Sequence, residues 1–238
     1  MDLVLRGASS IGIELDSYQV ELFERYYSFL RERNSSVNLT SKNALELAEI
    51  RHFLDSLQVS LALNPDMLDS GKFVDIGSGA GFPGLPMKIA FPGLRPTLIE
   101  SVGKKSQFLE ELVRKLELEN VSVITARAEI MARRDDLREK FDFAVARAVA
   151  NIATLAELTL PFCRIGGLVI IPKGPDIQQE LDEGMNAIYE VGGKVKRIIP
   201  TTMDRFGKRP SSLLVIEKIF GTSDLYPRRP GLPAKRPL

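Results

Sequence analysis

The glycine-rich loop at residues 77–84 carries the clearest sign of chemistry in this chain. It follows an apolar segment that contains Asp75, and glycines stand at positions 77, 79, 81 and 84. Glycine lets a strand turn sharply into a helix and lets a ligand approach the backbone closely. Ligands of open α/β sheets bind at the carboxyl ends of the strands. The loop therefore predicts a ligand site at the end of the strand before it.

Two cofactors fit this loop. Gly79, Gly81 and Gly84 satisfy the G-x-G-x-x-G fingerprint of dinucleotide binding, and Glu100 follows at a suitable distance to accept hydrogen bonds from a ribose. The longer pattern, which starts at Asp75 and includes Gly77, resembles motif I of class I methyltransferases, which bind S-adenosyl-L-methionine. In that resemblance Glu100 again holds the ribose, because a carboxylate can accept two hydroxyl hydrogen bonds. A purely structural turn is the third alternative.

The elements that must position this loop alternate regularly between strands and helices. Short apolar segments predict strands at 72–76, 97–100, 121–125, 141–146, 167–171, 194–200 and 212–219. Helical spacing of apolar residues predicts helices at 83–91, 104–118, 152–160 and 177–189. This alternation predicts a doubly wound α/β fold, Rossmann-like, with a mostly parallel sheet and an antiparallel closing strand.

Two further helices are predicted before the first strand. Asp16 and Gln19 form a capping-box pattern that opens one helix, and a second helical pattern runs over residues 44–63 and stops at Asn64-Pro65. The first 15 residues carry no strong signal. We expect these N-terminal helices to form a cap on the α/β domain.

Composition excludes several classes of protein. No apolar run among the 238 residues approaches the roughly 20 needed to cross a bilayer, and the N-terminus does not resemble a signal peptide. The lone Cys163 cannot form an internal disulfide, which favours a reducing, cytoplasmic setting. One histidine and one cysteine also argue against a structural zinc site, which needs about four such ligands. We expect no metal and no membrane partner.

Charge is unevenly distributed along the chain. Residues 191–238 contain eleven Lys and Arg and three Asp and Glu, which gives this segment a net charge of +8. The whole chain has a net charge of +1, so the other residues together carry −7. A basic C-terminal end suggests a polyanionic partner. A solvated tail that aids solubility explains the charge equally well. The proline-rich segment 226–238 is expected to be extended and mobile in isolation.

An ordered set of short motifs resembles one family over nearly the whole chain. The motifs are NLTS at 38–41, RHFLDS at 51–56, GFPG at 81–84, ESVGKK at 100–105, ARA at 146–148 and PKG at 172–174. Their combination is similar to the small-subunit rRNA guanine-N7 methyltransferases, also called glucose-inhibited division protein B (RsmG/GidB). The resemblance implies transfer of a methyl group from S-adenosyl-L-methionine to N7 of a guanine in 16S rRNA. S-adenosyl-L-homocysteine would be the other product.

The resemblance also implies a set of cofactor-binding residues. Gly77 and Phe82 would contact the cofactor from the loop, and Glu100 would hold the ribose. Ala128 and Glu129, after the third strand, would line the adenine site with a backbone amide and a carboxylate. Arg147, after the fourth strand, falls at a cofactor-site position.

Seven residues are candidate contacts for the RNA substrate: Arg51, His52, Lys104, Lys173, Arg205, Arg228 and Arg229. The basic ones suit phosphates and would make binding depend on salt. Arg51 and Asp55 are four residues apart, so they can also form an ordinary helix ion pair. A lone histidine such as His52 is more often structural than catalytic. We expect this helix to pack over the cofactor pocket and to help admit or orient the RNA.

No catalytic base is expected. N7 of guanine carries a lone pair and no proton at neutral pH, and the sulfonium of the cofactor already activates the methyl group. Holding the two reactants in line can contribute on the order of 7–11 kcal/mol. The protein's task in this prediction is therefore to position the reactants.

The sequence leaves other functions open. A small-molecule methyltransferase would keep the cofactor and change the substrate, and a non-catalytic RNA-binding ribosome-assembly factor would keep only the fold. We expect three parts: a helical cap at 1–70, the S-adenosylmethionine-binding methyltransferase domain at 71–220 and a basic tail at 221–238. We also expect a cytoplasmic monomer that acts on 16S rRNA in the small ribosomal subunit or in an assembly intermediate.

Overall fold

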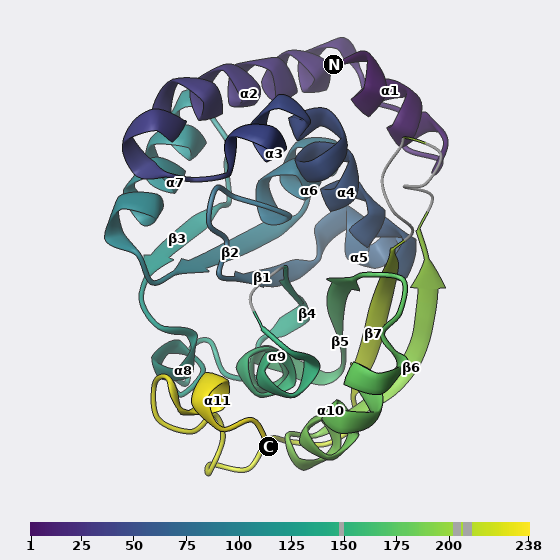
Figure 1. The fold of residues 1–238 in the computed structure, drawn as a ribbon, viewed down its shortest axis with the longest axis vertical. Helices are drawn as coiled ribbons and strands as arrows, with labels where there is room; N and C mark the ends of the chain where they lie inside the picture. Colours follow the sequence, from purple (N-terminus) through teal and green to yellow (C-terminus); the bar gives the residue numbers. More distant parts are fainter. Residues whose placement is uncertain (148–149, 202–205, 207–210) are drawn as a thin grey trace.

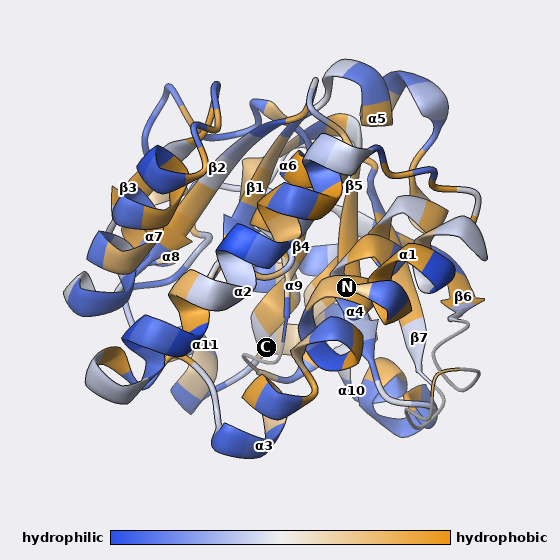
Figure 2. Cartoon of the chain, turned by 90° about the horizontal axis from the view of Figure 1, so that it is seen from above, coloured by the Kyte–Doolittle hydropathy of each residue, from blue (hydrophilic) through white to orange (hydrophobic). Residues whose placement is uncertain are grey.

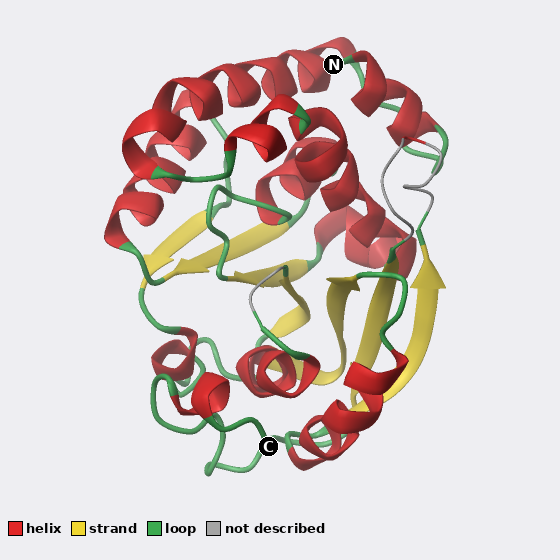
Figure 3. Ribbon diagram, viewed as in Figure 1, coloured by secondary structure: helices red, strands yellow, loops and turns green. Residues whose placement is uncertain are grey.

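A seven-stranded sheet forms the centre of the molecule (Figures 1 and 3). The structure is a computed structural model that describes residues 1–147, 150–201, 206 and 211–238. The strand order is β3-β2-β1-β4-β5-β7-β6, and β7 runs antiparallel to both of its neighbours. The strands are β1 Lys72–Ile76, β2 Arg95–Glu100, β3 Ser122–Thr125, β4 Phe141–Ala146, β5 Cys163–Lys173, β6 Gly193–Pro200 and β7 Ser212–Lys218. The predicted mostly parallel sheet with an antiparallel closing strand is confirmed.

Helices cover both faces of this sheet (Figure 1). One layer holds the N-terminal helices together with α6 and α7, and the opposite layer holds α8, α9, α10 and α11. The helices after the first strand are α6 Gly84–Ala90, α7 Gly103–Lys115, α8 Ala128–Met131, α9 Ile152–Thr159, the 3₁₀ turn η3 Leu160–Phe162, α10 Gln178–Glu190 and α11 Leu232–Lys235. The doubly wound arrangement follows from the βαβ alternation read from the sequence.

Alternation along the strands divides the core into two clusters, one on each face. Phe73 and Phe143 pack toward the N-terminal helices, whereas Val74 and Ala144, one residue further on, pack toward α9 and α10. Successive side chains of a strand point to opposite faces, so a strand with both faces covered is apolar throughout. Figure 2 shows this as apolar strands between helices whose polar sides face outward.

The N-terminal region packs directly on the sheet. It holds α1 Asp2–Ser9, α2 Ser17–Val37, α3 Lys42–Glu46, the π-helix η1 Glu49–Leu54, α4 Asp55–Leu57, the 3₁₀ turn η2 Gln58–Ala62 and α5 Pro65–Ser70. The predicted capping box is present, because the Asp16 carboxylate accepts from the backbone of Gln19 and the Gln19 side chain accepts from the backbone of Asp16. Buried residues of α2 belong to the same hydrophobic cluster as Phe73. The division at residue 70 stays a prediction.

The second predicted N-terminal helix differs from the structure. Residues 44–63 do not form one helix but change from the α-helix α3 to the π-helix η1, then to the short α-helix α4 and finally to the 3₁₀ turn η2. A π-helical turn widens the backbone and is frequent at functional sites. Here it contains His52, whose ring faces the glycine loop, so packing overrides the helical periodicity of this segment. Helix α1 was not predicted at all.

The C-terminal tail is bound to the body of the molecule. The Arg133 guanidinium donates to the carbonyl oxygen of Pro227 at 2.7 Å, and that of Arg138 donates to the carbonyl oxygen of Tyr226 at 3.0 Å. The segment is not extended throughout, since it contains the short helix α11 Leu232–Lys235. These arginines hold its backbone carbonyls, so the tail lies against the protein and differs from the mobile segment expected in isolation. No helix among the described residues is long and apolar enough to cross a membrane.

Candidate functional site

The glycine loop joins β1 to α6 at the carboxyl end of the sheet. Gly77, Gly79 and Gly81 adopt φ angles of 71°, 57° and 98°, which L side chains rarely adopt. A Cβ at position 81 would also lie 2.6 Å from the Tyr26 hydroxyl oxygen. Glycine at 81 is therefore required both by the backbone conformation and by the close approach of α2.

Asp75 anchors the loop from below. Its Oδ2 atom accepts a hydrogen bond from the Gly84 backbone N–H at 2.9 Å, and the residue is fully buried. Its Oδ1 atom has no hydrogen-bond partner among the residues that the structure describes. Burial raises the pKa of Asp75 to about 7, against the opposing effect of the Gly84 hydrogen bond. Asp75 holds the turn and does not itself reach the solvent side of the loop.

Glu100 ends β2 beside the loop. Its Oε2 atom accepts from the Gly79 N–H at 2.9 Å, and its Oε1 atom accepts from the Val102 N–H at 2.8 Å. These two backbone donors fix the carboxylate in place. A carboxylate has about four lone-pair sites, so two remain for hydroxyl donors of a ligand.

A small cavity opens next to Glu100 at the ends of β1, β2 and β3. Its volume is about 80 Å³, and its lining is Ile76, Gly77, Ile99, Ser101, the segment 126–129 and Leu158. Three of these residues are branched apolar side chains that suit the faces of a flat ring. The Glu129 side chain is only 2% exposed and accepts from Arg127 Nη2 at 2.8 Å. The cavity thus offers an apolar slot with a carboxylate at its edge.

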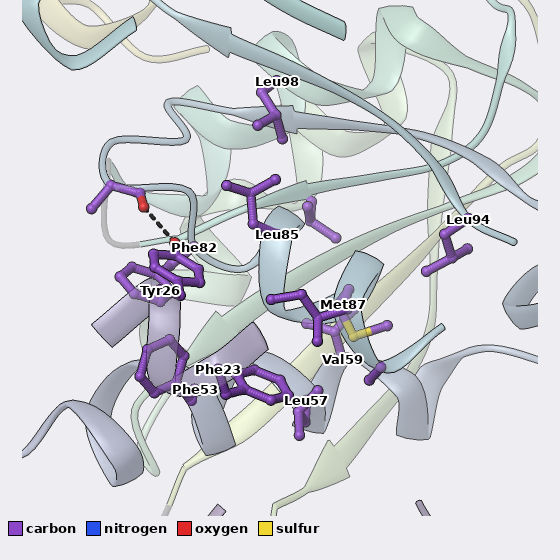
Figure 4. Packing of buried hydrophobic residues seen from close by; sticks show 14 of the residues in the cluster. Phe23, Tyr26, Phe53, Leu57, Val59, Phe82, Leu85, Met87, Leu94 and Leu98 are labelled. Carbon is purple, nitrogen blue, oxygen red and sulfur yellow. Dashed lines mark hydrogen bonds between the residues drawn. The ribbon is translucent and has the colours of Figure 1, made fainter. Parts of the chain in front are cut away.

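A column of stacked rings forms the other side of the loop, and Figure 4 shows two of its members, Tyr26 and Phe82. The Phe82 ring lies between the rings of Tyr26 and His52, with centroid distances of 5.3 Å and 4.5 Å and interplanar angles of 5° and 14°. The Tyr26 hydroxyl donates to the Ala80 carbonyl oxygen at 2.5 Å. We call Tyr26, His52, Phe82 and Arg147 the aromatic cluster. It connects α2 and η1 to the glycine loop.

Arg147, directly after β4, joins the aromatic cluster to the N-terminal region. Its guanidinium carbon lies 5.2 Å from the centroid of the Phe82 ring. Its Nη1 atom donates to Asp55 Oδ2 at 3.1 Å, and its Nη2 atom lies 3.2 Å from His52 Nδ1. Guanidinium only donates, so Nδ1 accepts and the ring proton of His52 sits on Nε2. Nε2 is 2.8 Å from the Thr40 hydroxyl and donates to it.

The structure brings the predicted cofactor residues together. Gly77, Glu100, Ala128 and Glu129 lie at one edge of the sheet, and Phe82 and Arg147 lie at the adjoining aromatic cluster. The parallel pairing of β1 with β2 and with β4 explains this, because residues at the ends of adjacent parallel strands meet.

The predicted RNA contacts are more dispersed. Lys173 Nζ is 2.6 Å from Glu180 Oε1, and Arg228 Nη2 is 2.6 Å from Glu157 Oε2, so both cations already have partners. The side chains of Arg51, Lys104 and Arg229 are exposed. Arg205 lies outside the described residues. Asp55 pairs with Arg147 rather than serving only as a helix partner of Arg51.

Sequence reasoning missed two members of this arrangement. Tyr26 is one of several apolar residues at helical spacing in α2, and nothing in that pattern marks its hydroxyl as a loop anchor. Thr40 belongs to the NLTS motif, and its contact with His52 becomes visible only in three dimensions. Among the described residues, no group of three or more Asp, Glu, His or Cys side chains could hold a metal ion.

Comparison with known proteins gives consistent matches over the whole chain. A family model described as rRNA small subunit methyltransferase G matches residues 19–205. Curated proteins named ribosomal RNA small subunit methyltransferase G are 47% identical in Roseiflexus sp. (strain RS-1) and 45% identical in Dehalococcoides mccartyi, with complete coverage of both chains. Among solved structures, the antibiotic-resistance methyltransferase Kmr shares the fold, with a TM-score of 0.52, 16% identity and coverage of 65% of this chain and 89% of the other.

Proposed function

The chain belongs to the rRNA small subunit methyltransferase G family, and on this premise we propose which of its residues bind S-adenosylmethionine and admit a guanine of 16S rRNA. The reaction is methyl transfer from the cofactor to N7 of that guanine. Family membership also decides between the two cofactors that fit the glycine loop, in favour of S-adenosylmethionine over a dinucleotide.

The residues at the sheet edge fit the adenosine part of this cofactor. The slot between Ile76, Ile99 and Leu158 suits the adenine ring, and Glu100 offers free lone pairs to the ribose hydroxyls. We assign the Ala128 N–H and the Glu129 carboxylate, both in the lining of the cavity, to the edge of the base. The exocyclic amine is the donor on that edge, so the Glu129 carboxylate is its complement. The observation that carries the proposal is an apolar slot with Glu129 in its lining and with Glu100 at the adjoining end of β2, between the lining residues Ile99 and Ser101.

The aromatic cluster closes the methyl-donor end of the site. The cofactor supplies a methyl group that its sulfonium already activates. Phe82 and Gly77 position the loop, and Arg147 holds His52 and Phe82 in a fixed stack. A rigid apolar wall orients a flat base and excludes water, which is the positioning that an in-line transfer needs. None of these residues has to remove a proton from guanine N7.

Exposed cations around the site suit the phosphates of the RNA. We keep Arg51, Lys104 and Arg229 as RNA contacts, because their side chains reach solvent. We do not keep Lys173 and Arg228 as RNA contacts, since each is paired with a carboxylate of the protein. A structured RNA must splay out its guanine to reach such a site. The protein is expected to act as a monomer in the cytoplasm, on the small ribosomal subunit or an assembly intermediate.

Labelled S-adenosylmethionine tests this function directly. The protein is incubated with naked 16S rRNA and with 30S subunits, both from a strain that lacks the enzyme. We expect label in the RNA, at N7 of one guanine, with one of the two substrates. RNA binding without label would instead indicate a non-catalytic assembly factor. Label transferred only to small molecules would indicate a different substrate class.

A further inference from the structure

The C-terminal tail, residues 222–238, passes beside the adenosine cavity. In Figure 1 the yellow end of the chain, with α11, lies next to α8 and α9. The Gly231 backbone N–H donates to Glu129 Oε1 at 2.8 Å, across 102 residues of sequence. A carboxylate of the adenosine cavity is thus bound by a group seven residues from the C-terminus.

Glu129 has few other groups to orient it. Besides the Gly231 N–H, the Glu129 carboxylate accepts hydrogen bonds from the Arg127 guanidinium, and the Arg127 side chain is 48% exposed. Burial opposes ionisation of Glu129, but hydrogen bonds from Arg127 and from the Gly231 N–H outweigh it and hold its pKa below the usual value. The carboxylate is therefore charged and, apart from its own backbone N–H, is directed by one half-exposed side chain and one backbone group of the tail.

Contacts on both sides of Gly231 fix this part of the tail. The Arg228 guanidinium donates to both oxygens of Glu157, which is fully buried, and the Arg228 backbone N–H donates to Glu157 Oε1 at 2.7 Å. The Thr154 hydroxyl donates to the Pro233 carbonyl oxygen at 3.0 Å. Thr154 and Glu157 belong to α9, the helix that also supplies Leu158 to the cavity. One helix therefore holds both the tail and a wall of the cavity.

Gly231 itself is required by conformation. Its φ angle is +80°, while a Cβ at this position would meet nothing within 4 Å. The left-handed backbone, which glycine adopts without cost, turns the chain so that the N–H of residue 231 faces α8. The backbone conformation, and not a lack of space for a side chain, therefore favours glycine at position 231.

We propose that Arg228 and Gly231 are positioning residues of the cofactor site: the tail holds the Glu129 carboxylate against the adenine amine through the Gly231 N–H, and the Arg228–Glu157 pair holds the tail. This inference rests on the proposed place of Ala128 and Glu129 at the adenine. It assigns to the C-terminal tail a part in cofactor selection, in addition to any contact with RNA.

Two ligands test the proposal by calorimetry. S-adenosylhomocysteine carries the adenine amine, and S-inosylhomocysteine has a carbonyl in its place. The unaltered protein is expected to prefer S-adenosylhomocysteine by about tenfold, as for one hydrogen bond to a charged group. Glu129→Gln and Arg228→Ala should each reduce this preference to about twofold. A purely structural role of Arg228 would weaken both ligands equally and leave their ratio unchanged.

Further variants guard against loss of folding. Arg228→Ala leaves the buried Glu157 without its cation, so Arg133→Ala, which releases the tail at Leu225 and Pro227, provides a milder change. The matched control is Arg134→Ala, which breaks an exposed arginine–carboxylate pair with Asp136 that does not touch the tail. Thermal unfolding of each variant verifies that it is folded before titration. We expect the ratio to fall in Arg133→Ala and to stay at the wild-type value in Arg134→Ala.

The outcomes separate the two proposals. If the unaltered protein does not bind S-adenosylhomocysteine, the proposed cofactor site fails, and the role of the tail fails with it. If it binds and Glu129→Gln loses the preference while both tail variants retain it, the cofactor site stands and the role of the tail is overturned.

Discussion

Two regions flank the glycine loop, and they are held in different ways. At the sheet edge, the backbone N–H groups of Gly79 and Val102 donate to the Glu100 carboxylate. Gly79 is 21 residues from Glu100 in the sequence and Val102 is 2 residues from it. In the aromatic cluster, Arg147 binds His52 through side chains that are 95 residues apart. The sheet edge is thus a product of strand ends and turns, whereas the cluster depends on the folding of the whole N-terminal region. Predictions about each region can test this difference.

The largest effect is expected beneath the sheet edge, at Asp75. Its pKa is raised from 3.8 to about 7 in the folded protein, so the folded state holds a proton that the unfolded chain loses between these values. The contribution of Asp75 to the stability of the ligand-free protein should therefore be complete below about pH 4 and fall by about 4 kcal/mol as pH rises toward 7. Asp75→Asn should remove this fall, as measured by urea unfolding across pH. Parallel stability curves for the two proteins would contradict the prediction.

Gly81 lies where the two regions meet, and Gly81→Ala should disrupt both. The new methyl group meets the Tyr26 hydroxyl at 2.6 Å in a backbone conformation with φ of +98°. Strain and overpacking together predict a loss of about 3 kcal/mol in unfolding free energy. Gly103→Ala is the matched control, since nothing lies within 4 Å of its added Cβ. An equal loss in the two variants would show that the contact with α2 is not responsible.

Arg147→Gln breaks the aromatic cluster alone. It removes the charge opposite Asp55, in a pair whose side chains are 15% and 11% exposed, and so should cost about 2 kcal/mol of stability. Asp55→Asn in the same chain should recover part of that loss, because it also removes the charge that faced Arg147. Arg134→Gln, at an exposed pair, should cause no measurable change in the melting temperature. If Arg147→Gln has the same melting temperature as Arg134→Gln, the Arg147–Asp55 pair does not stabilise the aromatic cluster.

Glu100→Gln should have the smallest effect on stability of these variants and should act mainly on ligand binding. The amide keeps one oxygen acceptor but loses the charge that strengthens hydrogen bonds from the ribose, which predicts about tenfold weaker binding of S-adenosylhomocysteine. Calorimetry measures this, and urea unfolding shows whether the two backbone contacts of Glu100 survive. Unchanged affinity would place the ribose elsewhere.

The strands and the sheet edge could be predicted because local sequence determines them. The bounds of β1 and β4 agree with the apolar segments 72–76 and 141–146 at both ends. Glu100 and Asp75 were identifiable because acids at strand ends meet at one edge of a parallel sheet. Local alternation and strand-end chemistry need no knowledge of distant contacts.

The aromatic cluster and the tail could not be predicted to the same depth. The periodicity of residues 44–63 indicates one helix, yet contacts of His52 with Thr40 and Arg147 accompany a π-helical turn there. Arg228 in a basic tail resembles a solvent-exposed cation, and only the fold shows that a buried Glu157 lies opposite it. Such pairings depend on which segments the topology brings together, and one sequence without its fold does not contain them.

The contact between Gly231 and Glu129 also bears on how the protein is made. Gly231 follows Glu129 by 102 residues, so this hydrogen bond cannot form until synthesis has proceeded well past α8. The sheet, the glycine loop and Glu100 all precede it in the chain and can be in place before then. The order of synthesis alone therefore sets the Gly231–Glu129 hydrogen bond after the strands and the loop that carry the other cofactor residues, and this step needs no chemical modification.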